Sequence, residues 1–183
     1  GLSQDVETDD NVFRQTTARL PWLIIGMLGG IGNSMILGNF DATFAAHPEM
    51  ALYIPLIGGT GGNVGTQSSA LIVQGLANSS LDSKNTLKQV AKEAVVALIN
   101  ATIISLLVYT YNFIRFGAMA TVTYSVSISL FAVVMFASIF GTLVPMTLER
   151  LKIDPAIATG PFIAITNDII GMMLYMGITV LLS

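Results

Sequence analysis

Cysteine is absent from this chain of 183 residues, and charged side chains are scarce, with Asp, Glu, Lys and Arg making up only 10%. Without cysteine there are no disulfides, no thiolate metal sites and no thiol redox switch. Soluble domains carry about 25% charged residues, so this chain could not cover a water-facing surface. Only one histidine is present, and the apolar stretches hold no nucleophile–histidine pair, so the sequence gives no basis for an enzyme. Lipid is therefore the expected solvent.

Apolar residues make up 53% of the chain and gather into five long stretches. Each stretch can cross a bilayer core of about 30 Å, which takes about 20 helical residues. We predict an all-α membrane protein, with a polar N-terminal segment at 1–19 that includes an interfacial helix over Asp10–Arg19, and a five-helix transmembrane domain at 20–183. The five spans are predicted at Leu20–Phe40, Leu52–Ala77, Ala94–Ile114, Val122–Leu148 and Ala156–Leu182.

The distribution of Lys and Arg predicts the orientation, because these residues favour cytoplasmic loops. With five spans and the N-terminus inside, only Arg115 lies outside. The cytoplasmic set is Arg14, Arg19, Lys84, Lys88, Lys92, Arg150 and Lys152. We predict a multi-pass protein of the cell inner membrane with a cytoplasmic N-terminus and an external C-terminus. The first nineteen residues lack the apolar core of a secretory signal, and the start at Gly1 without methionine is what a processed or excised fragment would show.

Asp168 lies in the middle of the last span, where a carboxylate costs at least ~2.5–3.5 kcal/mol on insertion scales. No Lys or Arg lies at a matching depth, so either a proton or a mobile cation is expected to compensate this charge. Pro161, Ala164 and Gly171 share the helical face of Asp168 and leave room beside it. Pro161 is also predicted to free the carbonyl of Ile157 one turn earlier.

The second stretch combines glycines with a polar stripe. Pro55 and the glycines of 58–62 make a regular helix doubtful, and an opened backbone would present carbonyl oxygens, which suit Mg²⁺ and Ca²⁺. A nucleotide-binding loop is excluded because no Gly-Lys-Ser/Thr ending follows. The alternative is that the polar groups only join helices. The stripe consists of Asn63, Thr66, Gln67, Ala70 and Gln74.

Several other features are interpreted structurally. Small residues at Gly26 and Gly30, and at Ala137 and Gly141, are spaced for close helix packing. Asp154 is expected to cap a helix ahead of Pro155. His47 is interpreted as an exposed loop residue between Asp41 and Glu49, which could attract cations only weakly. Three amides, Asn33, Asn100 and Asn167, are candidates for hydrogen bonds between helices, and Asn167 points about a hundred degrees away from Asp168.

The run Pro55–Ser68, ending in Gly-Gly-Asn-Val-Gly-Thr-Gln-Ser, resembles the glycine-rich signature of the MgtE family of magnesium channels. Asp154–Phe162 and Thr166–Gly171 look like its last transmembrane helix, and Arg19–Leu23 resembles the entry into its first. The likeness covers nearly the whole chain from about Arg14 onward.

The resemblance implies a homodimer with the pore on its twofold axis and Asp168 of both protomers facing a hydrated Mg²⁺. It implies added contacts from carbonyls near Ala164 and a place for Asn63 beside the pore. The predicted metal-site residues are Asp168, Ala164, Asn63, Gly59 and Thr66. Family members also carry a cytosolic N-domain and CBS domains, which this sequence does not contain.

We therefore predict a passive channel whose transported ion is Mg²⁺, with Mn²⁺, Co²⁺ or Ca²⁺ as further candidates. Its expected partners are the lipid bilayer and a second copy of itself, with no nucleic acid. Two alternatives stay open. One is a coupled transporter that exchanges Mg²⁺ for Na⁺ or H⁺, and the other is an accessory membrane subunit without transport.

Overall fold

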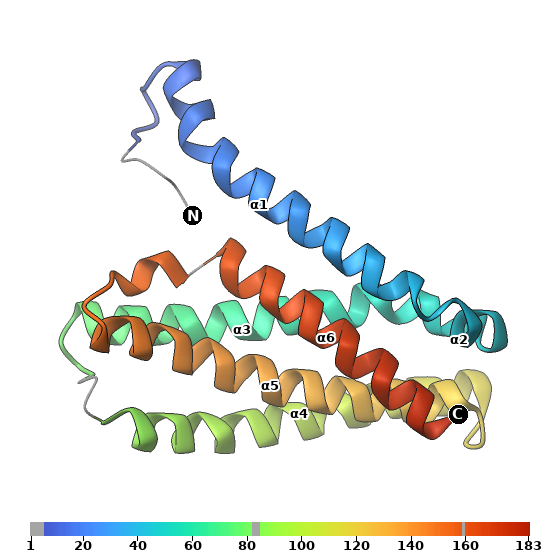
Figure 1. The fold of residues 1–183 in the computed structure, drawn as a ribbon. Coiled ribbons are helices and arrows are strands. Elements are labelled where there is room, and N and C mark those ends of the chain that lie inside the picture. The colour runs from blue at the N-terminus through green and yellow to red at the C-terminus, as the bar shows by residue number, and fades with distance from the viewer. Residues whose placement is uncertain (1–5, 82–84, 159) are drawn as a thin grey trace.

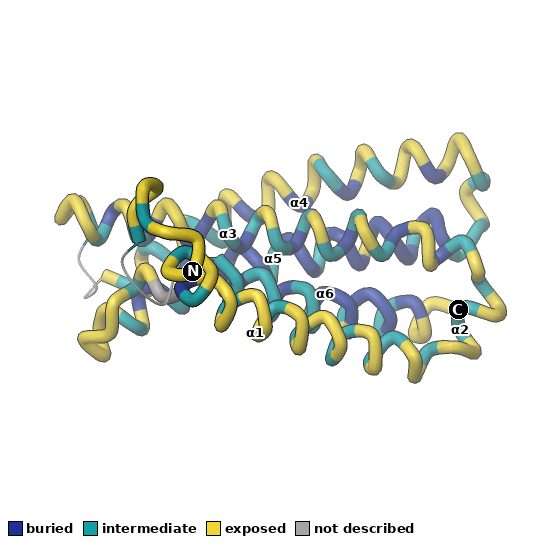
Figure 2. Tube along the Cα trace, turned by 90° about the horizontal axis from the view of Figure 1, so that it is seen from above, coloured by how far each residue is buried: buried dark blue, intermediate teal, exposed yellow. Residues whose placement is uncertain are grey.

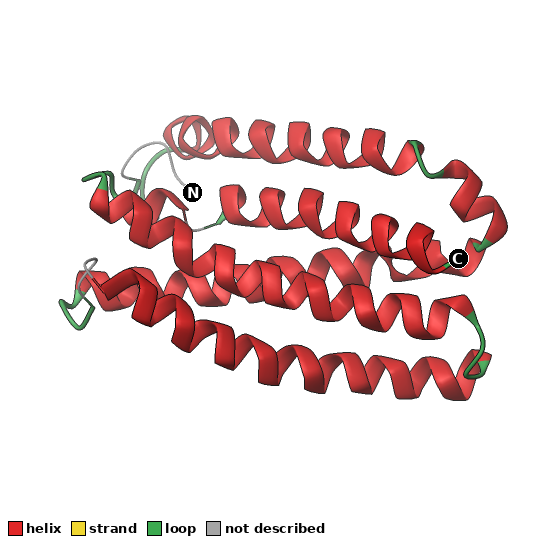
Figure 3. Ribbon diagram, turned by 60° about the horizontal axis from the view of Figure 1, so that its bottom comes forward, coloured by secondary structure: helices red, strands yellow, loops and turns green. Residues whose placement is uncertain are grey.

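The computed structural model describes residues 6–81, 85–158 and 160–183, and every regular element within them is a helix (Figure 3), as predicted. The long helices alternate in direction along the chain (Figure 1). They are α1 (Val12–Gly38), α3 (Ile54–Ala77), α4 (Thr86–Phe116), α5 (Thr121–Arg150) and α6 (Pro161–Leu182). The short elements are α2 (Asp41–Ala46) and the 3₁₀ helices η1 (Pro48–Tyr53) and η3 (Pro155–Ala158).

Helix α1 begins earlier than predicted. Asn11 caps it, with Oδ1 accepting the Arg14 N–H at 2.9 Å, and the helix continues through Pro21 without a break. Residues 12–19 are therefore the first turns of α1 and not a separate helix, and their position at the membrane interface stays a prediction. Most of α1 is exposed, and its main neighbour is α6 (Figure 2).

The contact of α1 with α6 uses Gly29. A Cβ on Gly29 would lie 2.4 Å from Cγ2 of Ile165, so the two helices meet closely there. A Cβ on Gly26 or Gly30 would meet no described atom within 4 Å, so the predicted Gly26–Gly30 spacing packs against nothing in the described part of the chain.

Helix α5 is the centre of the bundle and packs against α3, α4 and α6 (Figure 2). Its closest approach is to α3, where a Cβ on Gly141 would lie 2.5 Å from the carbonyl oxygen of Gly65. Ala137, one turn earlier, is fully buried. The predicted small-residue packing at Ala137 and Gly141 is confirmed.

Helix α3 is continuous from Ile54 to Ala77, so the prediction of an opened backbone at the glycines of 58–62 is wrong. Pro55 lies in the first turn, where its missing N–H leaves no intrahelical bond unmade. Neighbouring helices pack against the glycines at 61 and 65, and such burial outweighs the low helix propensity of glycine. Carbonyls of α3 are consequently held in helical hydrogen bonds.

The start of the last span was also predicted wrongly. Helix α6 begins at Pro161, after Gly160 takes a φ of +94°, a conformation that glycine adopts without strain. Pro161 is thus a first-turn residue, and it does not interrupt a helix in order to free the carbonyl of Ile157. Asp154 caps η3 instead of α6, accepting the Ala156 N–H at 2.9 Å, so its structural role is confirmed.

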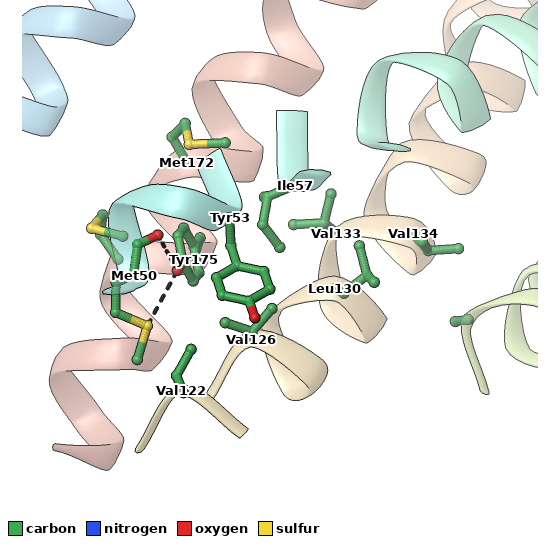
Figure 4. Packing of buried hydrophobic residues seen from close by; sticks show 12 residues of the cluster. Met50, Tyr53, Ile57, Val122, Val126, Leu130, Val133, Val134, Met172 and Tyr175 are labelled. Carbon is green, nitrogen blue, oxygen red and sulfur yellow. Dashed lines mark hydrogen bonds between the residues drawn. The ribbon is translucent and has the colours of Figure 1, made fainter. Parts of the chain in front are cut away.

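A buried cluster fixes η1 and the start of α3 to the rest of the bundle. Figure 4 shows Met50 and Tyr53 packed beside Ile57 and against residues of α5 and α6. The Tyr175 hydroxyl donates to the carbonyl oxygen of Met50 at 2.8 Å, and the Tyr53 hydroxyl donates to Oδ1 of Asn112 on α4. These bonds set where α3 begins and hence where its polar face lies.

Four of these helices, α1, α4, α5 and α6, are long and apolar enough to cross a membrane. The protein is therefore a multi-pass membrane protein. Helix α3 has 24 residues but is not among the four, and we attribute this to its glycines and its polar stripe, which lower its hydropathy.

Candidate functional site

A groove of about 470 Å³ runs between α3 and α6. Its floor is formed by glycines of α3, and its wall carries the Asp168 carboxylate. The lining residues are Gly58, Gly59, Gly62, Asn63, Thr66, Gln67 and Ala70 of α3 and Ala164 and Asp168 of α6. All five residues predicted as the metal site are among them.

Glycines of α3 make room for the carboxylate. A Cβ on Gly58 would lie 3.4 Å from Oδ1 of Asp168, and one on Gly62 would lie 3.9 Å from the same atom. These two glycines are four residues apart, so they occupy one helical face. Any larger side chain at either position would occupy the space in front of Asp168.

Asp168 lies seven residues into α6, about 10 Å along the helix from its first residue. Its side chain is partly exposed to the groove, and within the described residues no ion pair and no side-chain hydrogen bond involves it. The same part of the chain contains no cluster of three or more His, Cys, Asp or Glu residues. Among the described residues the groove thus has a single carboxylate without a partner, with neutral oxygen atoms beside it.

The neutral polar groups of the groove differ in whether they already have hydrogen-bond partners. Asn63 and Gln67 are exposed on the groove face, whereas the Thr66 hydroxyl donates to the carbonyl oxygen of Gly62 at 2.8 Å and keeps its lone pairs for other partners. Ala164 lies one turn before Asp168, with its N–H bonded to the carbonyl of Gly160 at 3.1 Å. The amide oxygens of Asn63 and Gln67 and the hydroxyl oxygen of Thr66 can accept hydrogen bonds from the water shell of a cation.

Two of the residues expected on the Asp168 face do not line the groove. Gly171 is buried, and a Cβ there would meet the side chain of Val133 on α5 at 3.5 Å. Pro161 begins the helix below the groove. The small face of α6 therefore serves two purposes, packing against α5 at Gly171 and opening to the groove at Ala164.

Asn167, next to Asp168, does not line the groove, in agreement with the prediction that it points about a hundred degrees away from Asp168. It is 1% exposed and lies against Gly65 of α3, with Nδ2 only 1.8 Å from where a Cβ would be. Neither polar atom of its amide has a partner among the described residues, and the same holds for Oδ1 of Asn33. Asn100 is exposed. The hydrogen bonds between helices that were predicted for these three amides are thus not formed among the described residues.

The acidic residues near η1 lie away from the groove. His47 ends α2 and is partly exposed, with Nδ1 3.6 Å from Oε1 of Glu49. Asp41 is exposed at the start of α2. Neither of these acids shares the groove with Asp168.

Sequence reasoning missed Glu93. It directly precedes the span predicted at Ala94–Ile114, but α4 begins at Thr86, so Glu93 lies seven residues into the helix. Its Oε1 accepts hydrogen bonds from the hydroxyls of Ser68 on α3, at 2.7 Å, and Ser138 on α5. The sequence does hold a signal for this contact, because Ser68 and Ser138 are polar residues within stretches that are predicted to span the membrane.

Comparison with known proteins places these features in a family. The family model MgtE, described as a divalent cation transporter, matches residues 54–178, which include the whole groove. The chain is 34% identical to the magnesium transporter MgtE of Thermus thermophilus over 90% of its length, and 31% identical to that of Bacillus subtilis over 96%. It is also 28% identical to the Enterococcus faecalis protein of that name over 94%.

The chain spans 36–39% of the length of these relatives, so the likeness concerns one part of each. That part carries the glycine-rich helix α3 and the acid-bearing helix α6, which together form the groove. Because the family model matches most of the chain, this protein belongs to the MgtE family of divalent cation transporters.

Proposed function

We propose that this protein conducts Mg²⁺ passively through a pore shared by two copies of the chain, with Asp168 of both copies at the ion site. The observation that carries the proposal is the unpaired Asp168 carboxylate in an open groove lined by glycines and neutral oxygen donors. A carboxylate at membrane depth needs a partner or a watery cavity. A mobile cation in a water-filled groove meets both needs.

The second copy is inferred from the face that the groove exposes. Asn63, Gln67 and Gln74 are exposed along α3, although polar amides are unfavourable against lipid. The single carboxylate that lines the groove offsets only one of the two charges of a divalent ion. Pairing two grooves across a twofold axis hides the polar faces from lipid, brings two carboxylates to one cation and encloses a path for it.

We further infer that α3 crosses the membrane beside the four apolar helices. Its 24 residues extend about 36 Å at 1.5 Å per residue, and it lies alongside α5 and α6 (Figure 1). A helix that lines a water-filled pore can have a polar face without exposing it to lipid, and this accounts for the lower hydropathy of α3. Five crossings put the start of α1 and the end of α6 on opposite sides, with the basic loops in the cytoplasm.

Direct Mg²⁺ flux measurements separate the channel from coupled exchange. The purified chain in liposomes should pass Mg²⁺ down its gradient with neither Na⁺ nor a proton gradient present. Flux that appears only when Na⁺ or H⁺ moves in the opposite direction would establish exchange instead. A complete lack of flux under both conditions, from protein that is folded, would leave only an accessory role.

A further inference from the structure

A polar cavity of about 420 Å³ lies at the start of α4. One side of the cavity is formed by α4, and the other by the segment that follows α3. The lining residues are Ser80 and Leu81 after α3, and Asn85, Lys88, Gln89 and Lys92 at the start of α4. None of them lines the groove beside Asp168, so the cavity is a separate site.

The segment after α3 is fixed to the end of that helix. The Ser80 hydroxyl donates to the carbonyl oxygen of Gly75 at 3.2 Å, and the Leu81 N–H donates to the same oxygen at 3.0 Å. The Leu81 side chain fills the space in front of Gly75, with Cδ1 2.4 Å from where a Cβ on that glycine would be. One wall of the cavity therefore moves with α3, and the other is part of α4.

The residues that line the cavity include two positive charges and no negative one. Lys88 and Lys92 are one turn apart on α4, so both side chains lie on the same helical face. Neither lysine forms an ion pair with another residue in the described ranges. Glu93 follows Lys92 in the chain, but its carboxyl group accepts hydrogen bonds from hydroxyls of α3 and α5 and does not line the cavity. With the amides of Asn85 and Gln89 as neutral donors, the cavity suits a phosphate group.

An apolar strip continues the lysine face of α4 into the membrane. Val95 and Ile99 follow Lys88 and Lys92 at helical spacing, and they are 59% and 55% exposed. Lysines at such a boundary cover apolar surface with their stems and keep their ammonium groups at the level of the lipid headgroups. A molecule that carries both a phosphate group and hydrocarbon chains matches the cavity and the strip together, whereas a free phosphate ion matches the cavity alone.

We propose that this cavity binds the phosphate-bearing headgroup of an anionic phospholipid, whose acyl chains lie along Val95 and Ile99. Basic pockets beside membrane helices bind headgroups of this kind. The bound lipid joins the start of α4 to the end of α3, the helix that lines the groove. Lipid binding at this site does not depend on Mg²⁺ transport, and the orientation proposed above puts it in the cytoplasmic leaflet.

Native mass spectrometry of the full chain with added phosphatidylglycerol or phosphatidylcholine tests the site. Wild type should bind phosphatidylglycerol more tightly than phosphatidylcholine. K88Q and K92Q should each weaken phosphatidylglycerol binding about fivefold, because each removes one positive charge beside the headgroup. The matched control is K152Q, which removes an exposed lysine outside the cavity and should change the affinity by less than about twofold. Unchanged binding in K88Q and K92Q, or an equal loss in K152Q, would overturn the proposal.

Thermal unfolding in detergent separates a lipid site from a phosphate-ion site. Phosphatidylglycerol should raise the unfolding temperature of wild type, and the double variant K88Q/K92Q should lose this rise while unfolding at the wild-type temperature without lipid, since both lysines are exposed. Inorganic phosphate at millimolar concentration should raise the unfolding temperature of neither protein. A rise with inorganic phosphate that matches the rise with lipid, and that the double variant loses, would identify a site for free phosphate and overturn the lipid assignment.

Discussion

Nδ2 of Asn167 occupies the space in front of Gly65, only 1.8 Å from where a Cβ on that glycine would be. The carbonyl oxygen of Gly65 is itself 2.5 Å from the Cβ position of Gly141. Helices α3, α5 and α6 therefore meet at one residue that has no side chain. This junction sets the distance between α3 and α6, and thereby the width of the groove beside Asp168.

Substituting Gly65 with alanine should destabilise the fold. The added methyl group would overlap the Asn167 amide and force it, or the helices, apart, at a cost of about 1–3 kcal/mol. Better helix propensity offsets roughly 0.5–1 kcal/mol of that cost. Thermal unfolding of the purified protein in detergent measures the result.

The matched control is G177A on α6, because a Cβ on Gly177 would meet no described atom within 4 Å. G177A should unfold at or slightly above the wild-type temperature, and G65A below it. Equal unfolding temperatures for the two variants would mean that Asn167 moves aside freely.

Four of the long helices could be predicted from the sequence because each one is a long apolar segment, and α3 because its polar residues recur at helical spacing. The ends of α3, α4 and α5 differ from the prediction by two residues or fewer, except at Thr86, where polar residues extend the start of α4 by two turns. Composition cannot tell a polar helical turn from a polar loop. For the same reason Glu93, which lies in those added turns, falls just outside the predicted span.

The groove could be predicted because its polar residues recur at the spacing of one helical face. Asn63, Thr66 and Gln67 recur at helical spacing, and the isolated acid Asp168 marks the facing helix. The state of the backbone could not be predicted. Glycines near Gly58 suggested an opened helix, but burial of α3 against its neighbours keeps it regular, and only tertiary contacts decide between these outcomes.

Replacing Asp168 with asparagine should abolish Mg²⁺ flux or lower it at least about tenfold, because the groove loses its only carboxylate. Folding should survive, since a neutral amide is easier to place in a membrane than a charge. Flux assays in liposomes measure this, with D41N as the control because Asp41 is an exposed acid outside the groove. Normal flux through D168N would remove Asp168 from the ion site.

Topology can be read by cysteine labelling, since the chain has no cysteine of its own. A cysteine at Lys88, exposed near the start of α4, should react with a membrane-impermeant reagent only after the cytoplasmic side is opened. One at Arg115, near the other end of the same helix, should react in intact cells. The reverse pattern would invert the orientation, and labelling of both from outside would contradict a spanning α4.

The ion at Asp168 should keep its water shell. Mg²⁺ releases water reluctantly and demands octahedral geometry at about 2.0–2.1 Å, which two carboxylates cannot complete alone. An ion with six waters has a radius of about 3.5 Å and a volume of roughly 180 Å³, less than the 470 Å³ of one groove. Carboxylates, amides and hydroxyls that line the groove can bind such an ion through its waters. An exchange-inert hexammine cation should therefore compete for the same place and block flux, and the Mg²⁺ to Asp168 oxygen distance in a metal-bound structure should be about 4 Å. Direct bonds from both carboxylates, or a lack of block by the hexammine ion, would show that the ion sheds water there.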